Sequence, residues 1–415
     1  MNTMNLDKRR WLVLIASCVT NLCIGSLYAW SVFAAPMAAK LSEVTGEPMT
    51  AATLSIVFTV ANAIGPIAMI SGGFFNDRIG PKRLILIGGV MFGCGMLASS
   101  VVNSVPLLTI TYGLGCGLGQ SLAYGCTISN SVKFFPDKRG LIGGIATATY
   151  GIGSVVLPPI ANAMIAGLGV SRTFQILGIF YIVVISICSF FIMKCPAGYA
   201  PEGYVAPTTG RVAVSADKNW KQMIADPLFY IMLVMLLCGG FSGLMITSQA
   251  SPMAQGLAGM TAAMAATTVS VLALFNAAGR VVAGFLSDWL GRSNVILGTF
   301  VLEIIGLTCL LNSGADTRLL FLVGVSIMGI CFGSLMGVYP GFTADQFGGL
   351  NNSLNYGIMF IGFGLAGIGG PMVVGKIVSA TGGYTYAFFV AMGLAVLGIL
   401  LTSLHKVVSK RRKVA

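Results

Sequence analysis

Long apolar stretches recur along the whole 415-residue chain, and short polar segments separate them. Each stretch is about 20 residues long, which is the length that an α-helix needs to cross the hydrocarbon core of a bilayer. The pattern predicts an all-α membrane protein with twelve transmembrane helices. The predicted spans are residues 11–35, 52–74, 84–103, 105–132, 141–166, 171–193, 227–250, 261–286, 293–312, 318–342, 353–377 and 383–405.

A polar segment with three prolines separates the sixth span from the seventh. Its prolines and charges make it unsuited to the interior of a membrane helix. We therefore expect an N-terminal six-helix half at residues 1–194, a linker at 195–226 and a C-terminal six-helix half at 227–415.

The two halves repeat a motif. The sequence Gly-Phe-Phe-Asn-Asp-Arg-Ile-Gly begins at Gly73 and ends the second span, and Gly-Phe-Leu-Ser-Asp-Trp-Leu-Gly begins at Gly284 and ends the eighth. The acids Asp77 and Asp288 hold the same place in the two copies, 211 residues apart. Duplicated halves, with a substrate site between them near the bilayer midplane, are typical of secondary transporters.

Composition and charge agree with this organisation. Charged residues make up 9% of the chain, whereas a soluble domain has roughly a quarter, so no globular core is expected outside the membrane. If the N-terminus is cytoplasmic, 19 of the 24 Lys and Arg residues lie on the inner side, and only Lys40, Arg172, Arg318 and Lys376 lie outside. This positive-inside bias places the linker and both termini in the cytoplasm and the protein in the cell inner membrane. The net charge of +12 therefore reflects topology and contact with lipid headgroups, and no nucleic-acid partner is expected.

The sequence lacks the groupings that catalysis or metal binding requires. Its ten cysteines have no Cys-x-x-Cys spacing, and we find no paired carboxylates, metal-ligand cluster or nucleophilic triad. We expect neither an enzyme nor a cofactor. The glycines at 113, 115, 117 and 119 lie inside a span without a following phosphate-binding lysine, so we interpret them as sites of close helix packing.

Arg280 is a charge within an apolar run. A cation in hydrocarbon costs at least ~2.5–3.5 kcal/mol, so such a residue faces water, a partner or a ligand. We interpret Arg280 as the counter-charge of an anionic substrate; the alternative is an arginine that snorkels or bonds a backbone carbonyl. Asn276 lies one turn earlier on the same helix face, where it orients the guanidinium, contacts substrate or bonds a neighbouring helix.

Glu303 is the other ionisable residue deep in a predicted span. Two interpretations stay open for it. It pairs with a neighbouring helix or sits protonated near lipid, or it belongs to a proton relay.

The motif that begins at Gly73 resembles the signature of a known family. It continues as Gly-Phe-Phe-Asn-Asp-Arg-Ile-Gly-Pro-Lys-Arg and looks like the G-x-x-x-D-R-x-G-x-[RK]-[RK] pattern of the major facilitator superfamily. In one conformation Asp77 would pair with cations or cap the next helix, and in another it would release them. The resemblance implies a twelve-helix fold and a gating motif made of Gly73, Asp77, Arg78, Gly80, Arg83 and, in the second copy, Asp288.

Within that superfamily, the whole chain is similar to the oxalate/formate antiporter group and related monocarboxylate carriers. The similarity is carried by residues 135–140 (Phe-Pro-Asp-Lys-Arg-Gly), by Leu-Phe-Asn at 274–276 with Arg280, and by Asn-Tyr-Gly at 355–357. It implies that Arg280 binds a carboxylate through the two-pronged geometry of its guanidinium. It also implies that the cavity is lined by Tyr28, Tyr124 and Tyr150, with Tyr339 as a weaker candidate.

The chain departs from the pattern of the oxalate exchanger at Phe363, where the similarity places a second cation, a lysine. Phe360 and Phe332 stand where that carrier has tryptophan, and Met336 where it has tyrosine. A dicarboxylate opposite one arginine would leave a charge uncompensated, so one cation indicates one carboxylate. Asn276 stands where animal-type carriers commonly have an aspartate, and its amide cannot carry a proton.

We therefore expect a carrier of small monocarboxylates of the lactate or pyruvate class that works by alternating access with a cotransported proton. The alternatives are an exchanger of carboxylate anions such as oxalate and formate, and a sensor that binds the acid without moving it. We expect a monomer whose partners are the anion, the proton and membrane lipid.

Overall fold

The computed structural model describes residues 3–51, 53–204 and 217–414, without the side chains of residues 3–5, 28, 262–263 and 411–414. Every regular element within these ranges is a helix, as the apolar pattern predicts. The elements are α1 (Thr3–Ile24), η1 (Gly25–Ala29), α2 (Trp30–Thr45), α3 (Ser55–Ala63), α4 (Gly65–Ile79), α5 (Pro81–Ser99), α6 (Val105–Leu108), η2 (Thr109–Cys116), α7 (Gly117–Phe134), α8 (Arg139–Phe191), α9 (Trp220–Ile224), α10 (Pro227–Gly256), α11 (Ala262–Leu290), α12 (Arg292–Leu311), η3 (Ala315–Thr317), α13 (Arg318–Phe347), α14 (Asn352–Met359), α15 (Ile361–Thr381) and α16 (Thr385–Val414).

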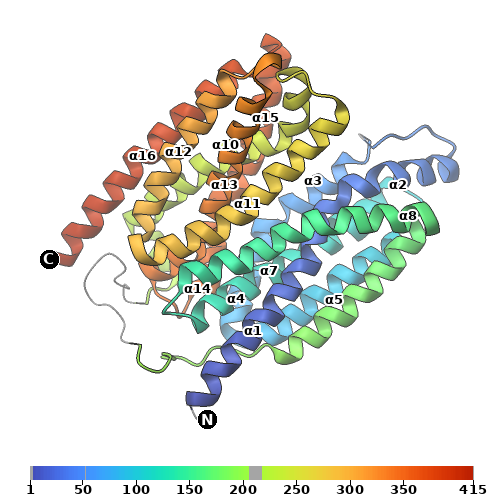
Figure 1. Cartoon of the computed structure of the whole chain (residues 1–415). Helices are drawn as coiled ribbons and strands as arrows, with labels where there is room; N and C mark the ends of the chain where they lie inside the picture. The colour runs from blue at the N-terminus through green and yellow to red at the C-terminus, as the bar shows by residue number, and fades with distance from the viewer. Residues whose placement is uncertain (1–2, 52, 205–216, 415) are drawn as a thin grey trace. The chain divides into compact units, whose positions relative to one another are not determined.

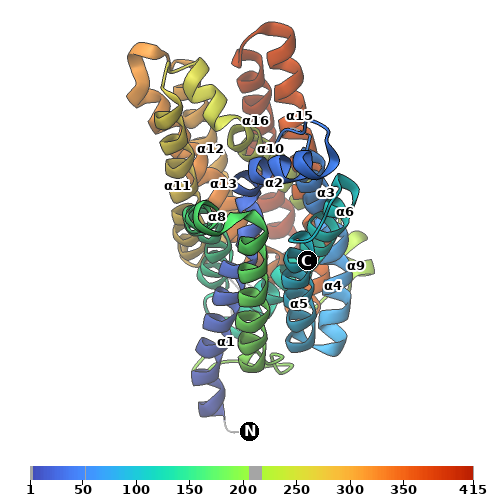
Figure 2. The ribbon, with the colours of Figure 1, turned by 90° about the vertical axis from the view of Figure 1, so that its right-hand side faces the viewer.

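Ten helical segments of the described chain are long and apolar enough to cross a membrane. This number agrees with the twelve predicted spans, because α8 holds the fifth and sixth spans and the fourth is divided among α6, η2 and α7. Helix α8 breaks at Gly169, whose φ of 78° and ψ of 163° are not helical, and both views show it reversing direction (Figures 1 and 2). The η2 segment is a π-helix, a wide turn that occurs often at functional sites.

The helices group into two compact units. The first unit contains the start of the eleventh span, and the second contains the start of the fifth. Residues 205–216 of the predicted linker lie outside the described residues, and the division into halves at 194 and 227 stays a prediction. The first unit comprises residues 1–135, 149–204 and 352–358, and the second comprises 136–148, 205–351 and 359–415.

In the first unit, α7 lies against α1, α4 and α5, and η2 lies against α3 and α5. A Cβ atom on Gly117 would lie 2.6 Å from the carbonyl oxygen of Ala61 on α3. One on Gly119 would lie 2.5 Å from the carbonyl oxygen of Gly88 on α5. Real Cβ contacts are longer than this, so the prediction that these glycines allow close packing is confirmed.

In the second unit, α10 lies alongside α15 and α16, α12 alongside α13 and α16, and α11 alongside α13 (Figure 1). Its interior holds large apolar side chains such as Met245, Phe321 and Phe388. Large apolar side chains also cover its surface, where Leu274 is 65% exposed and Trp289 is 72% exposed. An apolar exterior suits a protein whose outer helices face lipid.

The two copies of the repeated motif adopt the same backbone conformation. Gly80 joins α4 to α5 with a φ of 90° and a ψ of 159°. Gly291 joins α11 to α12 with a φ of 87° and a ψ of 145°. A positive φ strains any residue with a side chain, so glycine permits the sharp turn between spans at both places. The sequence repeat is therefore also a structural repeat.

We expect Gly119→Ala to lower the melting temperature of the detergent-solubilised protein, because the added methyl group would overlap the α5 backbone and overpacking costs about 1–3 kcal/mol. The matched control is Gly298→Ala on α12, where a Cβ atom would meet nothing within 4 Å. Alanine favours a helix by about 1 kcal/mol over glycine, so the control should not lose stability. Equal melting temperatures for the two variants would contradict the packing described above.

Candidate functional site

Arg280 lies about two-thirds of the way along α11 in the second unit and is 7% exposed. Glycines on two neighbouring helices allow their backbones to approach it. A Cβ atom on Gly144 of α8 or on Gly337 of α13 would overlap the carbonyl oxygen of Arg280, and one on Gly333 would overlap that of Asn276. Helices α8, α11 and α13 therefore enclose the arginine tightly.

The guanidinium group of Arg280 is held by two neutral acceptors. Its Nε donates to Oδ1 of Asn276 at 2.9 Å, and its Nη1 donates to the carbonyl oxygen of Thr147 on α8 at 2.7 Å. Within the described part of the chain, no carboxylate forms an ion pair with it. These acceptors orient the guanidinium without cancelling its charge, so a cation ready for an anion lies in an apolar helix bundle.

Three phenylalanines of the second unit form what we call the aromatic cluster: Phe332 on α13, and Phe360 and Phe363 at the start of α15. The rings of Phe332 and Phe363 are stacked with centroids 6.1 Å apart, and those of Phe360 and Phe363 with centroids 4.6 Å apart. A Cβ atom on Gly243 of α10 would lie 2.5 Å from the Phe332 ring. The sequence departures at these positions therefore produce one continuous apolar surface.

The tyrosine candidates are placed less uniformly. Tyr124 and Tyr150 lie together in the first unit, with ring centroids 4.7 Å apart. The side chain of Tyr28 lies outside the described residues. Tyr339 is fully buried, and its hydroxyl donates to the carbonyl oxygen of Met232 at 2.8 Å, which gives it a role in joining α13 to α10.

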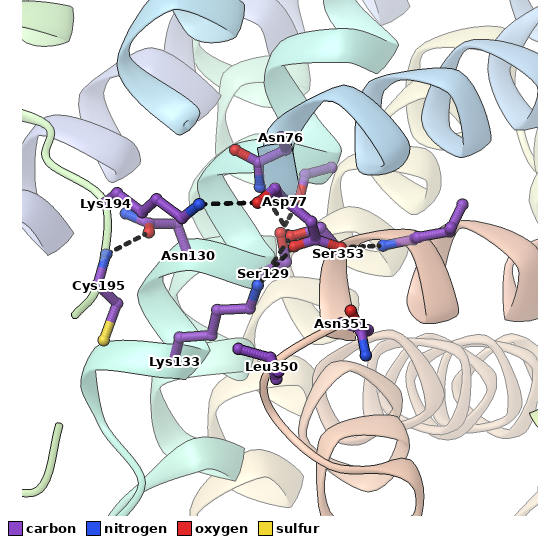
Figure 3. A network of polar contacts seen from close by, with 12 residues as sticks. Asn76, Asp77, Ser129, Asn130, Lys133, Lys194, Cys195, Leu350, Asn351 and Ser353 are labelled. Atoms are coloured by element: carbon purple, nitrogen blue, oxygen red, sulfur yellow. Dashed lines mark hydrogen bonds and ion pairs between the residues drawn. The ribbon is translucent and has the colours of Figure 1, made fainter. Parts of the chain in front are cut away.

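Asp77 of the gating motif binds both a cation and a helix start in the first unit (Figure 3). Nζ of Lys133 lies 2.7 Å from its Oδ1, and the two side chains are 16% and 15% exposed. The backbone N–H of Leu354, in the first turn of α14, donates to its Oδ2 at 3.3 Å. An anion is favoured at this end of a helix because the peptide dipoles point toward it. The sequence predicted that Asp77 would cap the next helix along the chain. The helix that it caps instead belongs to the eleventh span.

Further contacts of the motif surround Asp77 (Figure 3). Nζ of Lys194 donates to its backbone carbonyl oxygen at 2.7 Å, and the amide of Asn76 donates to the hydroxyl of Ser353 at 2.7 Å. A Cβ atom on Gly73 would lie 2.5 Å from the carbonyl oxygen of Ser353. The motif glycine therefore lets α14 reach the acid.

Lys133 pairs with Asp77, whereas Arg78 and Arg83 of the motif have other surroundings. The guanidinium of Arg78 lies over the ring of Phe74 at 3.9 Å from the centroid, and Arg83 is exposed. Both lie next to the end of a span, where long basic side chains reach polar surroundings.

Asp288, in the second copy, repeats this helix capping in the second unit. Its two oxygens accept the backbone N–H groups of Gly140 and Leu141, at the start of α8, each at 2.9 Å. Its Oδ1 also pairs with Nη1 of Arg292 at 2.7 Å. Each motif acid therefore caps the first turn of a span that is distant in sequence, the eleventh for Asp77 and the fifth for Asp288. The ion pair of Asp288 is with Arg292 and not with Arg280, which lies two turns earlier on α11.

Asp345 completes a buried charge network that the sequence analysis missed. Its two oxygens pair with Nη1 of Arg139 at 2.7 Å and with Nε of Arg292 at 2.8 Å. Asp345 is the only acidic residue after Asp316 in the sequence. This isolation could have marked it as a candidate partner for the basic residues. Because the network is almost fully buried, each charge depends on its partners for solvation.

Glu303 is 1% exposed on α12, so the prediction of a position near lipid is wrong. No ion pair to Glu303 is found within the described residues either. In the same part of the chain, no group of three or more His, Cys, Asp or Glu side chains is arranged to hold a metal ion.

The membrane-spanning helices and the duplicated motif define a multi-pass membrane protein with two related parts. The sequence model of the major facilitator superfamily matches residues 15–347 and 259–415, and the chain belongs to that family of secondary transporters.

Relatives of this chain include carboxylate carriers. It is 30% identical over 369 residues to the uncharacterized MFS-type transporter YhjX of Escherichia coli (strain K12), which covers 89% of this chain and 88% of the relative. It is 27% identical over 383 residues to the oxalate:formate antiporter of Oxalobacter formigenes, covering 92% and 88%. It is 25% identical over 381 residues to monocarboxylate transporter 12 of Xenopus laevis, covering 86% and 80%.

A solved structure shares the fold. The fucose:proton symporter of E. coli superposes with a TM-score of 0.70 at 12% identity, over 94% of this chain and 98% of the symporter. At such low identity the similarity concerns the fold alone.

We expect Asp345→Asn to destabilise the protein strongly, because Arg139 would stay buried without an acid and breaking a buried ion pair costs about 3–5 kcal/mol. Thermal unfolding in detergent measures the effect. Asp316→Asn, at an exposed position, serves as the matched control and should unfold like the parent protein. A melting temperature for Asp345→Asn equal to that of this control would show that the network contributes nothing to stability.

Proposed function

We propose that this transporter moves small monocarboxylate anions across the membrane and that Arg280 binds their carboxylate group. The observation that carries the proposal is the buried guanidinium whose partners are the neutral oxygens of Asn276 and Thr147. A carboxylate supplies the missing negative charge and accepts two parallel N–H bonds from the guanidinium fork. Low dielectric in the bundle strengthens that contact.

The bond from Arg280 to Thr147 suggests how binding leads to movement. A charged acceptor forms a hydrogen bond roughly twice as strong as a neutral one does. An arriving carboxylate would therefore take Nη1 from the Thr147 carbonyl and remove a polar link between α11 and α8. Neutralising the guanidinium also lowers the penalty of moving it, so the loaded carrier alternates between its two states more readily than the empty one.

The charge of Arg280 and the apolar aromatic cluster favour a short aliphatic acid such as lactate or pyruvate. The second unit offers Arg280 as a substrate cation, and the aromatic cluster offers an apolar surface on α13 and α15. The names of two relatives, an oxalate:formate antiporter and a monocarboxylate transporter, support the carboxylate as the recognised group. Cotransport of one proton would make the load electrically neutral.

The basic residues support a placement in the inner membrane with the linker and both termini in the cytoplasm. We propose a monomer built of the halves 1–194 and 227–415. The gating motif would then act on the cytoplasmic side.

The second candidate function is obligatory exchange of carboxylates, and the similarity to the oxalate:formate antiporter favours it. Countertransport in proteoliposomes separates the two functions. Uptake that needs internal substrate and ignores a pH gradient indicates exchange, whereas uptake into empty vesicles that an inward proton gradient accelerates indicates symport.

We expect Arg280→Ala to abolish uptake of radiolabelled L-lactate in proteoliposomes, because no cation would remain to bind the carboxylate. Arg280→Lys keeps the charge but loses the fork, so its uptake should fall by about tenfold or more, which corresponds to ~1.4 kcal/mol of binding. Arg172→Lys, at an exposed position, is the matched control. Normal uptake by Arg280→Ala would remove this residue from the mechanism.

We expect Phe363→Lys to widen the substrate range toward dicarboxylates. The new ammonium group would supply a second positive charge beside the Phe360 ring, so oxalate would no longer carry an uncompensated charge. Competition of unlabelled oxalate with labelled lactate measures the change. Oxalate that competes no better with the variant than with the parent protein would place Phe363 away from the substrate.

A further inference from the structure

Glu303 is a carboxyl group in the interior of the second unit. It lies on α12, about midway between the helix ends, and is 1% exposed. The ring of Phe300, one turn earlier, lies against Gly239 of α10 and Gly398 of α16, and α12 also packs along α13. Three neighbouring helices therefore separate the carboxyl group from lipid.

Glu303 has no basic partner in the part of the chain that the structure describes. Among the described residues it forms no ion pair, and neither of its oxygens accepts a hydrogen bond. The titratable groups that interact with it are the thiols of Cys238 on α10 and Cys331 on α13. On α16, the ring of His405 bonds Ser293 instead. An ionised carboxylate in such surroundings is costly, so the group holds a proton.

The hydroxyl of Ser242 connects Glu303 to α10. It lies next to the carboxyl group, and its Oγ donates to the carbonyl oxygen of Cys238, with the two oxygens 3.5 Å apart. A protonated Glu303 can donate its O–H to the oxygen of Ser242, but an ionised one can only accept. Loss of the proton therefore requires the Ser242 hydroxyl to turn from α10 toward α12.

The same turn of α10 contacts the aromatic cluster on its other side. Gly239 faces Leu335 of α13 and Phe300 of α12, whereas Gly240 faces Ala366 and Phe363 of α15 and Gly243 faces the Phe332 ring. A Cβ atom on Gly240 would lie 3.8 Å from Phe363, and one on Gly243 would lie 2.5 Å from Phe332. Because the Gly243 backbone packs directly on the Phe332 ring, a shift of α10 at Ser242 reaches the cluster through this contact.

We propose that Glu303 is the proton-binding site of this transporter and that residues 239–243 of α10 transmit its charge state to the aromatic cluster. The inference rests on the proposed carboxylate transport. On one side of the membrane a proton from water bonds to a Glu303 oxygen and the anion binds Arg280. On the other side the O–H bond breaks, the proton returns to water and the anion leaves, so each cycle carries a neutral load.

The test uses the full-length protein in liposomes with radiolabelled L-lactate. Glu303→Gln imitates a carboxyl group that never loses its proton, so the loaded carrier should still reorient. We expect this variant to retain counterflow, in which external labelled lactate exchanges with internal unlabelled lactate. It should lose the uptake that an inward proton gradient drives. Thr308→Val is the matched control, because that exposed hydroxyl on α12 bonds only the Ile304 carbonyl of its own helix.

Each outcome of this test has one meaning. Gradient-driven uptake by Glu303→Gln at the parental rate would refute the proton site and leave carboxylate transport intact. Absence of both counterflow and uptake in the parent protein, for every carboxylate tried, would instead refute the proposed function. Loss of counterflow in Glu303→Gln, with lactate still raising its melting temperature, would also refute the proton site, because the residue would then serve reorientation itself.

Infrared spectroscopy of the parent protein detects a protonated carboxyl group directly, so this measurement does not require Glu303→Gln to fold. We expect the carbonyl stretch of a protonated carboxyl group at neutral pH, with a frequency that shifts when lactate binds. Glu303→Asp, which keeps the acid, should move this band. A spectrum without such a band would overturn the inference.

Discussion

The second unit is organised around one buried guanidinium group, that of Arg280, which has no acid partner among the residues that the structure describes. Its charge cannot be solvated by lipid, so neutral oxygens must orient it: the side chain of Asn276 and the backbone of Thr147. Those contacts require α8, α11 and α13 to approach each other closely. Glycines at 144, 333 and 337 make that approach possible. Electrostatics and packing are therefore two aspects of one arrangement.

Both copies of the repeated motif use an acid to hold the start of another helix. A transporter needs helix ends that hold together in one state and separate in another, and an acid against the N–H groups of a helix start provides such a contact. Asp77 and Asp288 both do this. Their surroundings differ, because Asp77 has a lysine that water reaches, whereas Asp288 belongs to a buried network with Arg292 and Asp345.

The sequence was sufficient for the helical spans, the repeat and the closely packed glycines, because hydrophobic length, motif spacing and the absence of a side chain are local properties. It also pointed to Arg280 and Asn276, since an isolated charge and its one-turn neighbour can be read from one helix. The partners from other helices could not be predicted. Thr147 contributes a backbone carbonyl, which has no signature in the sequence. The burial of Glu303 depends on which face of α12 meets its neighbours, and α12 is apolar on nearly all sides.

The two capping sites differ in exposure to water, so dissolved salt weakens their charge pairs to different extents. Dissolved ions weaken attractions between charges that water can reach, over a distance of about 8–10 Å at physiological ionic strength, but hardly affect buried charges. The contact of Asp77 with Lys133 is open to this weakening, whereas the pairs of Asp345 are shielded from it. A rise in the surrounding salt concentration would therefore weaken the Asp77 copy of the motif more than the Asp288 copy.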